Sequence, residues 1–364
     1  MNRTIFFFLG TEAELIKIFP VIIEAKKRGI SYKIIASGQN DIVNSNIFRK
    51  INCGNVDLEL SKESDIKKNA VGLLRWWIKT YSVASEKIKR QFPEVDFEKS
   101  KIVVHGDTVS TYMGAKIGKK LGMQVCHVEA GLRSHNIFSP FPEEIDRMLT
   151  SRIARVHFAP GEIATDNLCH VQGEVVNTKH NTLLDSLEYS KNIPLESDLT
   201  DLLRSEYFVF VMHRQENLAN KKFVMDVVSE IVEATKKRKC VIIMHEITKN
   251  VFESVNILKD LKTNNNIVLM PRMDYFDFMK ILDNSRFVIT DGGSNQEELY
   301  YMAKPCLIMR TTTERNEGIG KNARLFNGQA DDVKNFLAEV EKMEIKPERL
   351  EGNPSKIIMD YLEK

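Results

Sequence analysis

The segment KIVVHGDTVSTYMGAKIGKKLGMQVCHVEAG, residues 101–131, has the pattern of one strand–helix–strand unit. The apolar runs at 101–105 and 124–128 have the length of strands, and 111–121 between them has the character of a helix. Both runs are apolar throughout instead of alternating with polar residues, which is typical of parallel strands buried on both faces of a sheet. This pattern predicts an α/β fold with a doubly wound parallel sheet and right-handed crossovers.

The same succession of short apolar runs and amphipathic stretches covers the rest of the chain. On the N-terminal side, strands are expected at 4–9 and 32–36, with a helix at 12–28. The pattern restarts after about residue 185, with strands expected at 208–212, 241–244, 267–270, 287–290 and 305–309 and helices at 222–237, 276–284, 295–302, 331–341 and 354–364. The stretch 181–194 is polar and is expected to link the two halves.

This repetition predicts two Rossmann-like domains. They are expected at residues 1–183 and 184–353, and the C-terminal helix at 354–364 could pack back on the first domain. Ligands of such folds bind beyond the carboxyl ends of the strands, here in the cleft between the two domains. The polar residues that follow the strands are therefore the candidate site residues.

The composition excludes several classes of protein. The 364 residues include 52 Lys and Arg against 50 Asp and Glu, and the net charge of +2 argues against a protein that coats nucleic acid. The apolar runs are far shorter than the ~20 residues needed to span a bilayer, and we expect no signal peptide. Five scattered cysteines without a CxxC pair predict buried thiols in a reducing cytoplasm instead of a zinc site or a disulfide framework.

A glycine-containing turn at Gly10 leads into the first expected helix. Backbone N–H groups at such a helix N-terminus can hold a phosphate. Glu12 and Glu14 would repel that anion, so capping of the helix by its own acidic residues is the alternative.

Three carboxylates, Asp107, Glu129 and Glu143, follow expected strands or a proline-rich turn in the first half of the chain. We predict that they converge on one cleft. Carboxylates crowded together raise one another's pKa, as a general acid or base near neutral pH requires. The alternatives are an N-cap role for Asp107 and a surface salt network with Arg133 and Arg147.

In the second half of the chain, His213 and Arg214 follow a strand and suit a phosphate or a leaving group; a capping or packing histidine is the alternative. The segment TDGGSNQEE, 290–298, has a Gly-Gly-Ser turn that runs into a helix. Its N–H groups could cradle a phosphate, and Glu298, one turn into the helix, could accept the two ribose hydroxyls. An ordinary helix-entry turn is the alternative here.

Together these motifs resemble the UDP-N-acetylglucosamine 2-epimerases, and the resemblance runs over most of the chain. Its parts stand in the family's order: HGDT at 105–108, HVEAGLR at 127–133, SPFPEE at 139–144 with Arg147, NT at 181–182 with Asp185, HRQEN at 213–217, TDGGSNQEE at 290–298 and KPCLIMRTTTER at 304–315. HVEAGLR followed by SPFPEE is highly specific. The resemblance implies a GT-B-like fold of two Rossmann-like domains that needs neither a metal nor a cofactor.

The resemblance implies a reaction at C2 of UDP-N-acetylglucosamine (UDP-GlcNAc). The family eliminates UDP to give a 2-acetamidoglucal and returns it after protonation on the other face, which yields UDP-N-acetylmannosamine (UDP-ManNAc). Asp107, Glu129 and Glu143 would be the acid/base carboxylates, and His213 would hold the departing diphosphate. The substrate- and nucleotide-binding residues would be Lys17, Arg147, Phe278, Gly292, Gly293, Ser294 and Glu298.

Four stretches depart from the family pattern, mainly at the nucleotide end. GTEAELIK at 10–17 has Glu12 in place of the family's arginine, an exchange that could cost roughly a few kcal/mol beside a desolvated pyrophosphate. The phosphate loop has TDGGSN in place of TDSGG, and HEITKN at 245–250 replaces H-x-N-P-N. GQND at 38–41 replaces GQHxE, a segment of the activator subsite in non-hydrolysing members.

Other functions therefore stay open beside UDP-GlcNAc 2-epimerisation. They are a hydrolysing 2-epimerase that releases N-acetylmannosamine and UDP, an enzyme for a modified UDP-amino sugar, and a GT-B glycosyltransferase. A glycosyltransferase would need an acceptor groove, for which Trp76 and Trp77 are candidates, with a helix packing face as the alternative. The three carboxylates argue against a nucleotide-sugar binder without catalytic activity.

The expected partners are a UDP-sugar and a second copy of the chain, because members of the family are often dimers. We expect no nucleic-acid or membrane partner, and a cytoplasmic location. The resemblance also implies that the product feeds a surface polysaccharide or nonulosonate pathway.

Overall fold

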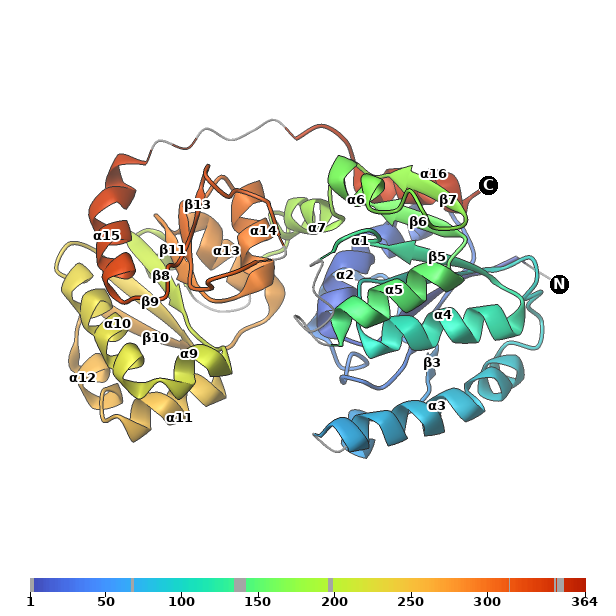
Figure 1. Ribbon diagram of the computed structural model, residues 1–364, viewed down its shortest axis with the longest axis horizontal. Coiled ribbons are helices and arrows are strands. Elements are labelled where there is room, and N and C mark those ends of the chain that lie inside the picture. Colours follow the sequence, from blue (N-terminus) through green and yellow to red (C-terminus); the bar gives the residue numbers. More distant parts are fainter. Residues whose placement is uncertain are drawn as a thin grey trace. The chain divides into compact units, whose positions relative to one another are not determined.

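The computed structural model describes residues 3–66, 69–133, 142–195, 199–313, 315–343, 345 and 350–364. The chain forms two compact units (Figure 1), a first unit of Met1–Tyr189 with Glu351–Lys364 and a second unit of Ser190–Leu350. They divide at 189/190 and 350/351, where the sequence placed the divisions at 183/184 and 353/354. Each unit is a parallel sheet flanked by helices, which confirms the α/β class with two Rossmann-like halves.

The first unit contains a seven-stranded parallel sheet with the order β3-β2-β1-β4-β5-β6-β7. Its strands are β1 (Ile5–Leu9), β2 (Tyr32–Ala36), β3 (Leu58–Glu59), β4 (Lys101–His105), β5 (Gln124–Val128), β6 (Val156–Ala159) and β7 (Glu174–Asn177). Every residue of the central strands β1 (IFFFL) and β4 (KIVVH) is buried, including Lys101 and His105 at the ends of β4. His105 pairs with Val128, so Asp107 and Glu129 leave the sheet from neighbouring strand ends.

The helix α4 (Val109–Leu121) connects β4 to β5 and begins at Val109 instead of residue 111. Thr108 is its N-cap, with a hydroxyl that accepts hydrogen bonds from two backbone N–H groups of the first turn at 3.2 Å. Gly114 faces the sheet so closely that a Cβ atom would lie 2.6 Å from the Phe8 ring. This close packing fixes the turn that carries Asp107.

Further helices flank the sheet of the first unit. Those in the described residues are α1 (Glu12–Lys27), α2 (Asn46–Ile51), α3 (Ala70–Gln91), α5 (Glu143–Ile153), α6 (Glu162–Asp166), α7 (Leu183–Ser190) and α16 (Pro354–Leu362), with a 3₁₀ turn at Glu63–Asp65. α1 ends at Lys27, one residue before the predicted limit of 28, and Gly29 follows its C-cap Arg28 with φ of +67°.

The sequence pattern did not predict α3. This helix buries Trp76 in the apolar core of the first unit. Trp77 stacks on Tyr81 and Tyr112, with ring centroids 5.1 and 5.8 Å away, and its Nε1 donates to the Val109 carbonyl at 3.0 Å. Both tryptophans therefore pack within the first unit, as the alternative to an acceptor groove expects, and Trp76 also lines a pocket beside α3.

The chain returns to the first unit at its C-terminus, where α16 packs against α1 (Figure 1). Arg28, just after α1, forms an ion pair with Asp360 at 2.7 Å. At the start of α16, the N–H of Ser355 donates to Asp185 of α7 at 2.7 Å. The predicted link over 181–194 contains the first division between the units, at 189/190, and most of this link is helical because it forms α7.

The second unit contains a six-stranded parallel sheet with the order β10-β9-β8-β11-β12-β13. Its strands are β8 (Tyr207–Val211), β9 (Lys239–Met244), β10 (Ile267–Pro271), β11 (Val288–Thr290), β12 (Cys306–Ile308) and β13 (Ala323–Leu325). Val211 pairs with Thr290, so His213 and Asp291 leave the sheet from neighbouring strand ends.

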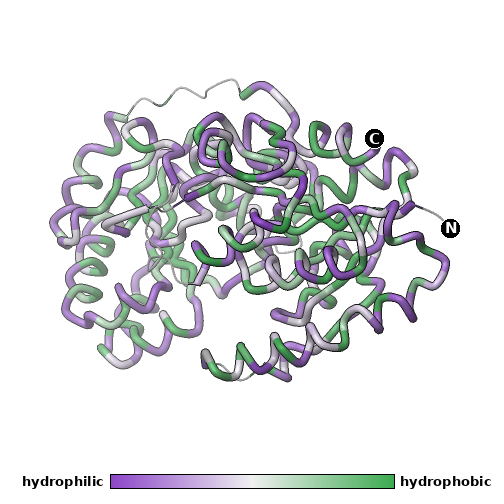
Figure 2. Tube along the Cα trace, turned by 45° about the vertical axis from the view of Figure 1, so that its right-hand side comes forward, coloured by the Kyte–Doolittle hydropathy of each residue, from purple (hydrophilic) through white to green (hydrophobic). Residues whose placement is uncertain are grey.

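The helices of the second unit cover both faces of its sheet. In the described residues they are α8 (Thr200–Leu203), α9 (Gln215–Ala219), α10 (Lys221–Ala234), α11 (Glu246–Ser254), α12 (Leu258–Thr263), α13 (Tyr275–Asn284), α14 (Gly293–Tyr301) and α15 (Asp331–Glu339), with a 3₁₀ turn at Val340–Lys342. Apolar side chains from strands and helices form the core of this unit, and Figure 2 shows the hydrophobic stretches gathered inside each unit.

The cysteines only partly match the expectation of buried thiols. Cys53, Cys126, Cys240 and Cys306 are buried and free, whereas Cys169 is free and exposed. Burial raises the pKa of Cys126 to about 12, so this thiol stays protonated. In the part of the chain that the structure describes, no helix has the length and hydropathy needed to cross a membrane.

Candidate active site

Glu129 follows β5 and adopts a left-handed backbone conformation with φ of +62°. That conformation costs a residue with a Cβ atom roughly 1–2 kcal/mol, so the surrounding structure must hold it. The buried Glu129 carboxylate forms an ion pair with Lys17 of α1 and accepts a hydrogen bond from the Asn181 amide. Nε2 of His105 lies 3.6 Å from the same oxygen. These contacts fix the carboxylate at the carboxyl end of the sheet.

Asp107 lies in the turn between β4 and α4 and forms an ion pair with Arg147 of α5. The buried Arg147 guanidinium also lies 3.4 Å from Glu144, which in turn pairs with Arg133. The salt network considered as an alternative therefore exists, but it is largely buried and includes Asp107. The other alternative is wrong, because Thr108 and not Asp107 caps α4.

Glu143 is the first residue of α5, and Asp146 follows one turn later on the same side of the helix. Each has a buried carboxyl oxygen, Oε2 of Glu143 and Oδ2 of Asp146, for which the described residues provide no hydrogen-bond partner. Burial, followed by the charges of Asp107 and Glu143, raises the pKa of Asp146 to about 7. The sequence assigned no role to Asp146, and residues 139–141 of the SPFPEE motif lie outside the described residues.

The turn at Gly10 is closed by a carboxylate of its own helix. The Gly10 N–H donates to Glu14 at 2.6 Å, and the other oxygen of Glu14 accepts from the Thr108 hydroxyl at 2.5 Å. Burial raises the pKa of Glu14 to about 7 despite these hydrogen bonds. The Gly10 N–H is therefore occupied by Glu14, which agrees with the alternative of capping by the helix's own acidic residues. Glu12 is half-buried and accepts from the Ser45 hydroxyl at 3.4 Å.

His127 supports the Asp107 turn from within the sheet. Its fully buried ring places Nε2 2.7 Å from the Gly106 carbonyl oxygen. Burial lowers the pKa of His127 to about 4 against the effect of this hydrogen bond. The ring is therefore neutral at pH 7, with Nε2–H donating to the turn.

In the second unit, Asp291 is a fully buried carboxylate that organises the end of β8. It accepts hydrogen bonds from the backbone N–H groups of His213 at 3.0 Å and Arg214 at 2.9 Å and from the Asn217 amide at 3.1 Å. Nδ1 of His213 lies 2.9 Å from Asp291 Oδ1. Burial opposes ionisation of Asp291, but the donors outweigh it and hold its pKa below the usual value.

The half-buried ring of His213 stacks on His245, with ring centroids 4.7 Å apart and planes 20° from parallel. Burial, followed by His213 and Arg272, lowers the pKa of His245 to about 4. His245 is therefore a neutral aromatic surface for His213. With Nδ1 facing Asp291, the His213 ring has Nε2 as its second nitrogen for a ligand.

α14 begins at the second glycine of the predicted Gly-Gly-Ser turn. Gly292 is its N-cap, and Gly293 and the exposed Ser294 are its first two residues. N–H groups at this position of a helix lack intrahelical acceptors, as an anion site requires. Glu298, one turn further on, is buried and accepts from the Asn295 amide at 2.7 Å.

The predicted site residues thus lie in two groups. Lys17, Asp107, Glu129, Glu143 and Arg147 belong to the first unit, and His213, Phe278, Gly292, Gly293, Ser294 and Glu298 belong to the second, with Phe278 half-buried on α13. A cleft shared by the two groups stays a prediction. Within the described ranges, no group of three or more His, Cys, Asp or Glu side chains could hold a metal ion.

Four residues in or beside these groups had no role assigned from the sequence, although Asn181 and Asp291 belong to motifs of the family resemblance. They are Glu14, Asp146, Asn181 and Asp291. Only Asp291 had a local signal, because it is a carboxylate that directly follows a strand and precedes the Gly-Gly turn. The other three depend on partners distant in sequence or on burial.

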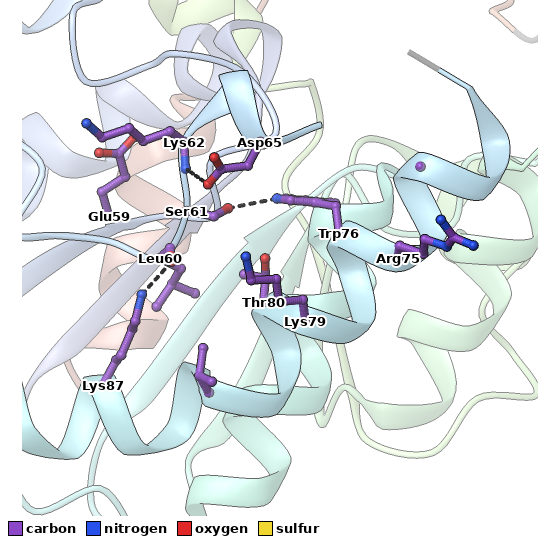
Figure 3. A pocket seen from close by; sticks show the side chains of 12 residues that line it. Glu59, Leu60, Ser61, Lys62, Asp65, Arg75, Trp76, Lys79, Thr80 and Lys87 are labelled. Carbon is purple, nitrogen blue, oxygen red and sulfur yellow. Dashed lines mark hydrogen bonds between the residues drawn. The ribbon is translucent and has the colours of Figure 1, made fainter. Parts of the chain in front are cut away.

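A separate pocket of about 500 Å³ lies in the first unit between α3 and the segment after β3 (Figure 3). Nε1 of Trp76 donates to the Ser61 hydroxyl at 2.7 Å, and Nζ of Lys87 donates to the Leu60 carbonyl at 2.8 Å. Among the residues that line this pocket, none belongs to the two groups above. It is therefore distinct from the carboxylate site.

Comparison with known proteins points to one family. A family model described as UDP-N-acetylglucosamine 2-epimerase matches residues 23–361. The UDP-N-acetylglucosamine 2-epimerase of Methanocaldococcus jannaschii is 30% identical over 349 residues, which cover 92% of this chain and 90% of that protein. Among solved structures, that of the Methanocaldococcus jannaschii enzyme in complex with UDP-GlcNAc and UDP is 26% identical, with a TM-score of 0.75 and coverage of 100% and 99%. The Neisseria meningitidis enzyme bound to UDP-GlcNAc is 26% identical, with a TM-score of 0.80 and coverage of 99% of both chains.

Proposed function

The chain belongs to the UDP-N-acetylglucosamine 2-epimerase family, and from that premise we propose that it interconverts UDP-GlcNAc and UDP-ManNAc. The observation that carries this proposal is the set of three carboxylates in the first unit. Asp107 and Glu129 are each paired with a buried cation, whereas Glu143 has no ion pair within the described residues. Such a set combines fixed negative charge with a carboxyl group that is free to move a proton.

The proposed reaction needs a base, an acid and a site for the departing diphosphate. In the first step a carboxylate removes the C2 proton, the C1–O bond breaks with its electron pair leaving on UDP, and a C1–C2 double bond forms. In the second step UDP adds back to C1 while a carboxylic acid protonates C2 on the opposite face. We assign these proton transfers to Asp107, Glu129 and Glu143. Glu143 suits proton exchange because no described cation holds it ionised.

Lys17 and Arg147 are the substrate-binding residues that we assign to the first unit. Both cations already contact carboxylates, Lys17 with Glu129 and Arg147 with Asp107. Their charges therefore offset those carboxylates, which would otherwise repel a diphosphate. This arrangement lets an anionic substrate approach a site rich in acidic groups.

In the second unit we assign the departing diphosphate to His213. Asp291 orients the ring through Nδ1, so Nε2 can donate to a phosphate oxygen. We assign the remaining contacts to the diphosphate for Gly292, Gly293 and Ser294, to the ribose for Glu298 and to the uracil for Phe278. The helix N-terminus at Gly293 supports the diphosphate assignment, because its N–H groups point away from the helix body.

A homodimer and a cytoplasmic location are also part of the proposal. Val71, Leu74 and Ile78 form an exposed apolar stripe on α3, which provides a candidate surface for a second copy. Light scattering coupled to size-exclusion chromatography should give a dimer, and Leu74→Glu should shift it toward the monomer. A monomeric wild-type protein would contradict the dimer. The cytoplasmic location rests on the four buried free thiols and is tested by cell fractionation.

The experiment that tests the reaction is incubation of the full chain with UDP-GlcNAc in D₂O, followed by proton NMR. The proposal expects UDP-ManNAc with deuterium at C2. Free N-acetylmannosamine with UDP would instead place the chain among hydrolysing 2-epimerases. If neither exchange at C2 nor release of UDP occurs, the proposed substrate is wrong.

A further inference from the structure

The acidic groups of the first unit differ in how their charge is balanced. Glu129 pairs with Lys17, Asp107 pairs with Arg147, and Glu144 pairs with Arg133 and Arg147. For Glu143 and Asp146, the described part of the chain provides no cation within ion-pair distance, and one oxygen of each is buried without a hydrogen-bond partner. Among the acidic side chains named in this paragraph, Glu143 and Asp146 are therefore the two whose negative charge no described cation neutralises.

Their positions on α5 bring the two groups together. Glu143 and Asp146 are one turn apart, and residues at that spacing lie on the same side of a helix. Two ionised carboxylates so close together repel each other, and buried oxygens without donors make the doubly charged state still less stable. One proton held by the pair removes both penalties.

The surroundings determine which of the two holds that proton. Asp146 is 7% exposed, whereas Glu143 is only half-buried, so ionisation of Asp146 loses more hydration. Glu143 is the first residue of α5, where the positive end of the helix dipole favours a carboxylate most. Burial together with the charges of Asp107 and Glu143 raises the pKa of Asp146 to about 7.

Other charged groups that face α5 do not offset the rise in the pKa of Asp146. Asp107, in the turn before α4, adds negative charge. Glu129, at the end of β5, is already paired with Lys17, and His127 of β5 is neutral. Arg147, on α5 itself, is engaged by Asp107 and Glu144.

We propose that Asp146 is a positioning residue that holds a proton at neutral pH and exchanges it with Glu143. This inference rests on the proposed epimerase function and deepens it. In each turnover one carboxylate gains a proton from C2 and one carboxylic acid loses a proton to C2. Both groups must return to their starting protonation states before the next turnover. Through a bridging water, neutral Asp146 gives its proton to the Glu143 carboxylate, which yields an Asp146 carboxylate and a Glu143 carboxylic acid, and Asp146 then takes a proton from the solvent. In the opposite direction Glu143 returns a proton to Asp146.

The first test is the pH profile of epimerisation by the full chain with Asp146→Asn, which keeps the shape of the side chain and removes its titration. We expect kcat at pH 7 to fall about 10-fold or more with KM changed less than about 2-fold, and the ionisation near pH 7 to disappear. Asp146→Glu, which keeps a carboxyl group, should recover part of kcat and the ionisation. The matched control is Asp166→Asn on the exposed end of α6, which should behave as wild type.

Asp146→Asn with wild-type kcat would overturn the proposal. Such an outcome would mean that a neutral amide serves as well as the carboxyl group and that no proton passes through it. A variant whose pH profile keeps the ionisation near pH 7 would overturn it equally. Matching thermal unfolding curves for Asp146→Asn and Asp166→Asn would separate these results from loss of the fold.

A second readout does not depend on turnover. Difference infrared spectroscopy as a function of pH should detect protonated carboxyl groups in the wild-type chain near neutral pH, and Asp146→Asn should remove one of them while that of Glu14 remains. Unchanged spectra in the variant would overturn the proposal whatever the activity. If the band is lost as expected but wild type does not act on UDP-GlcNAc, proton storage by Asp146 is supported and the proposed function fails.

Discussion

Asp146 in the first unit and Asp291 in the second are both buried carboxyl groups, yet their pKa values are displaced in opposite directions. Asp146 has acidic neighbours and an oxygen without a donor among the described residues, so burial dominates and raises its pKa. Asp291 accepts hydrogen bonds from two backbone N–H groups and an amide and lies beside His213, and these donors lower its pKa despite its burial. The number of hydrogen-bond donors around a buried carboxyl group, more than its degree of burial, therefore decides whether the group is protonated or ionised.

The same contrast assigns different tasks to the two units. In the first unit, Glu14 and Asp146 both have pKa values near 7, which suits a region that takes up and releases protons. In the second unit, Asp291 has a lowered pKa and lies 2.9 Å from Nδ1 of His213, the residue that we propose for the departing diphosphate. Variants in the first unit should change proton transfer, and variants in the second unit should change the binding of UDP.

The largest expected effect is on Glu143. Glu143→Gln removes a group that we assign to proton transfer, so kcat should fall by about 10²–10⁴-fold, while the dissociation constant for UDP changes little. Steady-state kinetics and calorimetric titration with UDP measure the two quantities. Glu86→Gln, an exposed change on α3, is the matched control. An active Glu143→Gln variant would remove this residue from the proton-transfer set.

Asp291→Asn should have the next largest effect. It should change stability and UDP binding, whereas Glu143→Gln changes kcat. The amide cannot accept from all the donors that face Asp291, so the free energy of unfolding of the second unit should fall by about 1.5–3 kcal/mol. UDP should bind roughly 10-fold more weakly as His213 loses its orientation. Denaturant unfolding and UDP titration test this, with the exposed Asp226→Asn as control. Unaltered UDP affinity would contradict a role for Asp291 in positioning His213.

The free energy of unfolding of the first unit should fall as pH rises, whereas the contribution of Asp291 to the second unit should grow as pH rises. Because the folded-state pKa values of Glu14 and Asp146 lie near 7, above the ordinary 4.5 and 3.8, the folded state binds more protons between about pH 4 and 7. Its stability should therefore fall by several kcal/mol as pH rises through that window and level off above it. Asp291 has a lowered pKa, so its contribution is present at higher pH and lost as pH falls below about 4.

Chemical denaturation at a series of pH values measures this dependence. Asp146→Asn should flatten the decline between about pH 4 and 7, because the amide does not titrate. A first unit that becomes more stable over that range would show that these two carboxyl groups are not protonated when folded.

The smallest expected effect concerns Glu12, which stands where the family has an arginine. If the half-buried Glu12 faces the nucleotide, Glu12→Arg replaces a repulsive charge by an attractive one, and UDP should bind about 2–5-fold more tightly. Calorimetric titration against wild type and the exposed Glu94→Arg control measures the change. Equal or weaker binding would show that Glu12 does not act on the nucleotide.

Much of the fold follows directly from the sequence because parallel strands buried on both faces are continuous apolar runs. The runs at Lys101–His105 and Gln124–Val128 become β4 and β5 with the predicted limits. α3 was missed because its apolar residues are divided between a buried side that includes Trp76 and an exposed stripe, which blurs the expected one-sided pattern. β7 was missed because it is a short edge strand that is only partly buried, and the four-residue strand β6 beside it was missed as well.

The site was less predictable than the fold. Asp107, Glu129 and Glu143 could be selected because they follow strands or a rigid turn. Asn181 was selected only as part of the NT motif, and its contact with Glu129 could not be predicted because the two residues are 52 positions apart in the sequence. Asp146 could not be selected, because its unusual protonation depends on burial and on neighbours that only the folded chain brings near it.

The return of α16 to the first unit makes the polypeptide pass between the units twice, at 189/190 and at 350/351. Cleavage of one passage would therefore leave two pieces joined by the other. After cleavage near the second passage, the C-terminal peptide would still be held by its docking on α1 and by the hydrogen bond from Ser355 to Asp185. The two connections thus tether the units to each other. The second unit stays at high effective concentration near the first even when one peptide bond between the units is cleaved.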